Sequence, residues 1–145
     1  MHPSEAFITY TTEIGKKIMR YDIQQSKQMD DLLVLPGDLT DQNVAIAVNY
    51  LNDGRLLHSR GDRIEILSED GEVIKTIGLE EHGWGIAQIS PSYDQEHFFT
   101  ANIFTGVAMK IRISDGEILG SIDTGYRAPK RSLAGIAEYG SLKDS

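Results

Sequence analysis

The feature that most constrains the fold is a repetition within the chain. Residues 7–23 read FITYTTEIGKKIMRYDI and align without a gap on residues 97–113, HFFTANIFTGVAMKIRI, at a shift of 90 positions. Both segments end in three apolar residues spaced two apart, which places them on one face of a β-strand. These residues are Met19, Tyr21 and Ile23 in the first segment and Met109, Ile111 and Ile113 in the second. The repetition predicts two β-units of the same design.

The most complete copy of the unit covers residues 83–123 and contains four short runs separated by turns. The first run ends in Ser90-Pro91-Ser92, and Asp115-Gly116 marks a hairpin before the last run. A middle copy covers residues 43–78 and repeats the Asp-Gly-Glu turn at a shift of 45. Residues 6–35 form a copy that lacks its first strand.

An Ile-Ala motif marks the first strand of each unit. It occurs in Ala45-Ile46-Ala47-Val48, Gly85-Ile86-Ala87-Gln88 and Gly135-Ile136-Ala137-Glu138, at spacings of 40 and 50. This is the period of the four-stranded blades of a β-propeller. The sequence therefore predicts an all-β half-propeller domain over residues 1–145: three blades, followed by a closing inner strand at 132–140. An antiparallel sandwich of about a dozen short strands is the alternative.

The third unit and the closing strand also resemble known repeats. The stretch GWGIAQISPSYDQEHFFTANIFTGVAMKIRISDGEILGSIDTG, closed by SLAGIAEYG, is similar to the NHL, YVTN and gluconolactonase-like β-propellers. The resemblance covers nearly the whole chain and concerns the fold. The chain departs from the pattern at residues 90–94, where many relatives have a compact Pro-Asp-Gly turn.

Three blades are too few to close a ring, because propellers have about four to eight. An open arc leaves a strand edge and blade faces without partners, which favours association. We expect two copies to pair by two-fold symmetry into a six-bladed propeller, a blade number that the resemblance also implies. Each C-terminal strand would then complete the first blade of the other copy. The alternative is that the chain is a fragment of a longer propeller.

Composition limits the partners. The 145 residues carry a net charge of −8, which argues against binding to nucleic acid through phosphates. No apolar run has the ~20 residues of a membrane helix, and the polar start is not a signal peptide, so the chain is predicted to be a cytoplasmic protein without membrane contact. With no cysteine, the chain has no disulfide or thiolate chemistry.

Candidate binding residues lie in the links that a propeller gathers on one face. These are the links between strands two and three of a blade and the links from one blade to the next. The residue types that binding sites favour there are His82, Trp84, Asn102, Phe104 and Tyr126, joined by the basic residues Arg127, Lys130 and Arg131.

Each candidate also has a structural interpretation. Trp84 can be a residue that packs between blades, and His82 can be a solvated loop residue. The basic cluster at 127–131 can be a salt-bridged junction loop rather than a site for an anion or an acidic surface.

The resemblance to gluconolactonase-like enzymes implies a divalent cation, such as calcium, at the channel mouth. Carboxylate and amide oxygens that could hold one come from Asp41, Asn43, Glu81, Asn102 and Glu138. The chain does not match that family's ligands residue by residue, and it contains no nucleophile, phosphate-loop or HExxH motif.

The sequence therefore favours a non-catalytic binding or assembly module. Such a module would dimerise and present a face to an unknown protein or small-molecule ligand. The alternatives are a metal-dependent lactonase or lyase of propeller type, and a truncated propeller.

Overall fold

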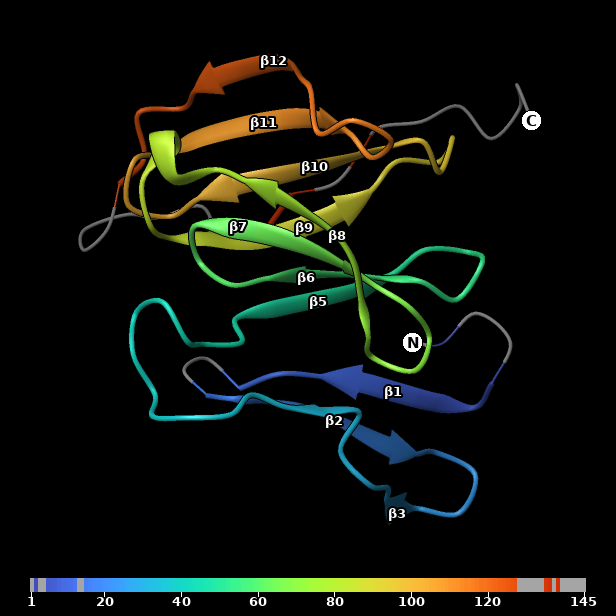
Figure 1. Cartoon of the computed structure of the whole chain (residues 1–145). Coiled ribbons are helices and arrows are strands. Elements are labelled where there is room, and N and C mark those ends of the chain that lie inside the picture. Colours follow the sequence, from blue (N-terminus) through green and yellow to red (C-terminus); the bar gives the residue numbers. More distant parts are fainter. Residues whose placement is uncertain (1, 3–4, 13–14, 128–134, 137, 139–145) are drawn as a thin grey trace.

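Three four-stranded antiparallel sheets follow one another along the chain (Figure 1). The computed structural model describes residues 2, 5–12, 15–127, 135, 136 and 138. We call the sheets blade 1, blade 2 and blade 3 in chain order. The fold class predicted from the repeats, all-β with three four-stranded units, is confirmed.

Blades 2 and 3 share one strand order, in which each strand pairs with the next strand along the chain. Blade 2 consists of β5 (Ala47–Tyr50), β6 (Leu56–Ser59), β7 (Arg63–Leu67) and β8 (Val73–Gly78). Blade 3 consists of β9 (Ile86–Pro91), β10 (His97–Asn102), β11 (Val107–Arg112) and β12 (Ile118–Asp123). A short 3-10 helix, η1 (Glu80–His82), links the two blades.

The Asp-Gly turns lie where the sequence predicts them, before the outer strands of both blades. Gly71 and Gly116 have positive φ angles of 88° and 74°. Glycine is favoured at these positions because other residues rarely adopt this conformation.

Blade 1 lacks, among the described residues, the strand that corresponds to β5 and β9. Its strands are β1 (Phe7–Tyr10), β2 (Lys17–Asp22), β3 (Lys27–Gln28) and β4 (Leu33–Val34). Both β3 and β4 pair with β2, so the outer strand expected at 32–35 consists of two short pieces. Between the two pieces, the chain bulges away from β2. The bulge is flanked by two backbone hydrogen bonds to β2, from Met29 N to Arg20 O and from Leu32 N to Ile18 O. A bulge of this kind is common at a sheet edge.

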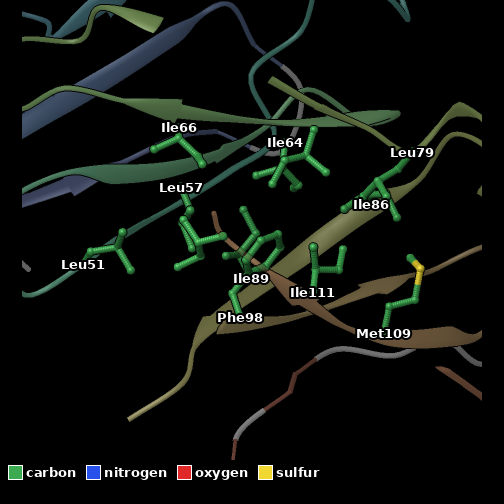
Figure 2. Packing of buried hydrophobic residues seen from close by; sticks show 12 residues of the cluster. Leu51, Leu57, Ile64, Ile66, Leu79, Ile86, Ile89, Phe98, Met109 and Ile111 are labelled. Atoms are coloured by element: carbon green, nitrogen blue, oxygen red, sulfur yellow. The ribbon is translucent and has the colours of Figure 1, made fainter. Parts of the chain in front are cut away.

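The largest core lies between blades 2 and 3 (Figure 2). Its fully buried members include Leu57, Ile64 and Ile66 from blade 2 and Phe98 and Ile111 from blade 3. These residues alternate along their strands with residues that point to the opposite sheet face, as the period of two requires. Facing sheets therefore pack through one apolar side each.

A smaller core joins blade 1 to blade 2. Ile18 of β2 packs with Leu56 and Leu67, and Leu32, Leu33, Val48 and Tyr50 surround them. Two side-chain hydrogen bonds cross the same seam, from Thr11 Oγ1 to Ile46 O at 2.7 Å and between Thr9 Oγ1 and Tyr50 Oη at 2.7 Å.

Most of the predicted closing strand, 132–140, lies outside the described residues. Of the three that are described, Ile136 lines a shallow hollow on blade 3, and the Glu138 carboxylate accepts bonds from Ser92 Oγ and Tyr93 N. In the described part of the chain, no helix has the length and apolar character needed to cross a membrane.

Candidate binding face

The links at one end of the blades lie against one another. Gly61, in the link from β6 to β7, accepts backbone hydrogen bonds from Gly85 and Ile86, where the next blade begins. Ala45 N donates in the same way to Gly15 O in blade 1. Each blade therefore holds the start of the next one through the same kind of link. We call this surface the link face.

Trp84 bridges three parts of the link face. Its indole N–H donates to Asp41 O at 2.6 Å, and its ring centroid lies 6.0 Å from that of Phe104. The ring also covers Gly61, where a Cβ atom would lie 2.7 Å from a ring carbon. The side chain is half-buried. Trp84 thus packs between blades, as one of its two interpretations predicts, and keeps part of its ring at the surface.

Asn102 fastens the link that precedes β9. Its side-chain amide lies within 3.2–3.3 Å of the carbonyls of His82, Gly83 and Trp84. Its Oδ1 accepts from the backbone N–H groups of Phe104 and Thr105. The side chain is fully buried. Its hydrogen-bonding groups are already used inside the protein, so Asn102 positions the aromatic residues around it.

Arg60 has the role between blades 1 and 2 that Asn102 has between blades 2 and 3, but with a charged side chain. Its guanidinium group is almost buried and donates to Val44 O at 2.9 Å, Glu65 Oε1 at 3.1 Å and Asn43 Oδ1 at 3.1 Å. Asn43 in turn donates to the carbonyls of Pro36 and Asp38. Arg60 therefore holds the link between blades 1 and 2 in place.

His58 lies beside this network and is fully buried. Its Nδ1 is 3.4 Å from Glu65 Oε1, and neither ring nitrogen has a hydrogen-bond partner among the described residues. Burial lowers the pKa of His58, and the charge of Glu65 offsets only part of this effect. Burial alone would raise the pKa of Glu65, but the Arg60 guanidinium, which donates to this carboxylate, holds it below its usual value. We therefore expect His58 to be neutral in the folded protein at pH 7.

This arrangement predicts a loss of stability in mild acid. The unfolded chain protonates His58 as the pH falls below about 6.5, whereas the folded chain does so only at lower pH. The free energy of unfolding should therefore fall by up to about 1.4 kcal/mol per pH unit below pH 6.5. In urea titrations from pH 7.5 to 5.5, H58L should remove this slope. The variant H82Q, which replaces a partly buried histidine at the end of η1, should keep it. Equal slopes in H58L and the parent would contradict the assignment.

The remaining binding candidates occupy different positions. Phe104 and Tyr126 are each 48% exposed, and the carbonyl of Tyr126 lies against Gly106 in the same link as Phe104. His82 ends η1 at the link face. Arg127 pairs with Asp123 at 2.8 Å, and Lys130 and Arg131 lie outside the described residues. Trp84, Phe104 and Tyr126 thus form the aromatic part of the link face.

The structure brings together only some of the residues predicted as metal ligands. Asp41 and Asn43 belong to the link before blade 2, but the Asn43 amide is engaged as described above. Glu81 is exposed in η1. Glu138 contacts Ser92, at the far end of β9 from Trp84, so its carboxylate is apart from the others. Calcium binding stays a prediction.

One acidic group was not anticipated. Asp94, Glu96 and His97 place possible ligand atoms within 4.8 Å of one another in the β9–β10 turn. Asp94 already accepts from its own turn, including His97 Nδ1 at 2.7 Å. Burial alone would raise the pKa of Asp94, but hydrogen bonds from Glu96 and His97 together hold it below the usual value. We interpret the group as turn chemistry of the kind that Asp provides.

Comparison with known proteins establishes the class of fold. No protein-family model matches the sequence, and no relative was found among curated proteins. Solved structures do match. The C-terminal WD40 domain of Sif2 superposes with a TM-score of 0.61 at 11% identity, over 84% of this chain and 35% of that one.

Two further structures agree. The WD40 domain of Neurospora crassa Pan2 has a TM-score of 0.58 at 12% identity, over 86% of this chain and 40% of that one. A Bacteroides caccae protein of unknown function has a TM-score of 0.66 at 15% identity, over 93% and 47%. The protein therefore has a β-propeller-type fold, and the chain spans less than half the length of these structures. The narrower resemblance to NHL repeats stays a prediction.

Proposed function

We propose that the protein is a non-catalytic binding and assembly module that presents the link face to a partner. The observation that carries the proposal is the presence of Trp84, Phe104 and Tyr126 on the link face, because Phe104 and Tyr126 are about half exposed and hydrogen bonds hold their backbone. Aromatic residues held in this way are typical centres of protein interfaces. The WD40 neighbours add support at the level of the fold.

The assembly part of the proposal is that two copies pair into a six-bladed ring. Its support is the open row of three blades: among the described residues, no strand pairs with the edge of β1 that faces away from β2, whereas β6 and β10 are each covered there by an inner strand. At that edge His2 N donates to Phe7 O at 3.1 Å. A second copy is the partner that supplies equivalent strands. In that ring the link faces of both copies would lie on one side.

The binding part of the proposal predicts that F104A selectively loses partner binding. Protein captured from an extract on immobilised chain should fall about fivefold or more, because removal of an interface anchor costs at least about 1 kcal/mol. Y93A is the matched control, since Tyr93 is 60% exposed in the turn after β9, at the opposite end of that strand from Trp84. Equal capture by both variants and the parent would contradict a role for the link face.

A further inference from the structure

The two ends of the row of blades expose sheet faces whose counterparts are buried inside it. Ile8 and Ile23 of blade 1 are 38% and 47% exposed, and Ile122 of blade 3 is 64% exposed. Their equivalents in the repeat are Phe98, Ile113 and Ile77, which are at most 5% exposed. The outer faces therefore carry apolar residues of the kind that a contact between two blades buries, and no described blade packs on them.

The outer face of blade 1 is equivalent to the side of blade 3 that packs on blade 2. Thr9, Thr11 and Ile18 point towards blade 2, so the residues that alternate with them point away from it. These are Ile8, Tyr10, Met19, Tyr21 and Ile23, which a shift of 90 places on Phe98, Thr100, Met109, Ile111 and Ile113. All five equivalents are buried, and four belong to the main core.

The outer face of blade 3 is equivalent to the other side of the same contact. In blade 2, Leu57 pairs with Ile66 and Ile64 pairs with Ile77 across the strands. The matching pairs in blade 3 are Phe99 with Lys110 and Ala108 with Ile122. The Lys110 ammonium lies 5.7 Å from the centre of the Phe99 ring.

Ile136 marks where the next blade would begin. It lines one hollow with Phe99, Ala108 and Ile122. Ile86, its equivalent at a shift of 50, packs in the core that contains Leu57, Ile64 and Ile77. Ile136 therefore occupies, on the outer face of blade 3, the position at which a fourth blade would begin.

We propose that the outer face of blade 3 binds the outer face of blade 1 of a second copy, with the geometry of the contact between blades 2 and 3. The proposal rests on the proposed pairing and assigns its surfaces and register. A second copy is the favoured occupant because the two outer faces are the two halves of one repeated contact. Two such contacts related by a two-fold axis close the pair.

One residue pair fixes the register. A Cβ atom at Gly116 would lie 3.6 Å from Ile77 Cβ across the contact between blades 2 and 3. The equivalents are Ser26 at a shift of 90 and Ile122 at a shift of 45. Ser26 keeps the conformation of Gly116, with φ of 51° against 74°, which a non-glycine residue seldom adopts. We expect Ser26 of one copy to face Ile122 of the other.

The test is the double variant S26C/I122C, whose two thiols are the only ones present because the chain has no cysteine. A Cβ separation of 3.6 Å is within the range of a disulfide. Ser26 lies in the turn between β2 and β3, and Ile122 lies in β12. These strands are at opposite ends of the row of blades (Figure 1), so one chain cannot bridge the two positions itself. Mild oxidation of dilute protein should give a covalent dimer, at least about tenfold above the control S26C/I74C, in which the second thiol replaces the exposed Ile74 of β8.

Light scattering of the parent chain and circular dichroism of the reduced variants complete the test. A mass of about 32 kDa, twice 16.1 kDa, together with the covalent dimer, is the expected result. A mass of 32 kDa without cross-linking above the control would overturn the assigned contact and leave the pairing intact. A folded species of about 16 kDa would overturn both, and a ladder of longer covalent products would overturn the closed pair.

Discussion

Truncation of Phe98 to alanine should lower the free energy of unfolding by about 3–5 kcal/mol. Phe98 is fully buried in β10, in the core between blades 2 and 3 (Figure 2). Its removal leaves a cavity that the two facing sheets cannot close, because each is held by its own hydrogen-bonded ladder. A domain of this kind has about 5–15 kcal/mol of stability in total, so the change is a large part of it.

Thermal and urea denaturation followed by circular dichroism measure the effect of F98A. The melting temperature should fall by roughly 6–20 °C for a chain of this length. F104A is the matched control, because Phe104 is 48% exposed and should cost less than about 1 kcal/mol. Similar losses in the two variants would show that the packing between blades 2 and 3 is not the main apolar contact.

The second large effect is expected at Arg60. In R60M the Glu65 carboxylate stays nearly buried without its guanidinium partner, and the link residue Asn43 loses a donor. Breaking a buried ion pair from one side costs about 3–5 kcal/mol. We therefore expect R60M to unfold at much lower urea concentration than the parent.

A second substitution separates the charge from the packing. R60M/E65Q removes the uncompensated carboxylate, so its loss should be clearly smaller than the sum of the two single losses. R63M is the surface control, since the Arg63–Asp62 pair is partly exposed and should contribute about 1 kcal/mol or less. A strictly additive double variant would contradict the buried-pair interpretation.

The repeats made most of the fold predictable, because hairpin turns and alternating residues are local signals. The shift of 90 correctly predicted that β1 and β2 are the equivalents of β10 and β11. The bulge that divides the outer strand of blade 1 was not predicted, because it depends on where unpaired residues leave β2.

The candidate site was less predictable, because its contacts join separate blades. Trp84 was singled out as an aromatic residue in a link, but its bond to Asp41 O crosses 43 residues. No local pattern indicates that Arg60, Glu65 and His58 form one buried group, since this depends on strand register. Asn102 was chosen as a candidate binding residue, and no sequence pattern indicated that its side chain bonds to the backbone around it.

The position of Trp84 has a practical consequence. It is the single tryptophan of the chain, and it is half-buried at a seam where three links meet. Its fluorescence therefore comes from one known place, without background from any other indole. The emission wavelength depends on how much water reaches the ring. It therefore reports directly whether the links pack closely around Trp84 or have separated, and the protein needs no attached dye.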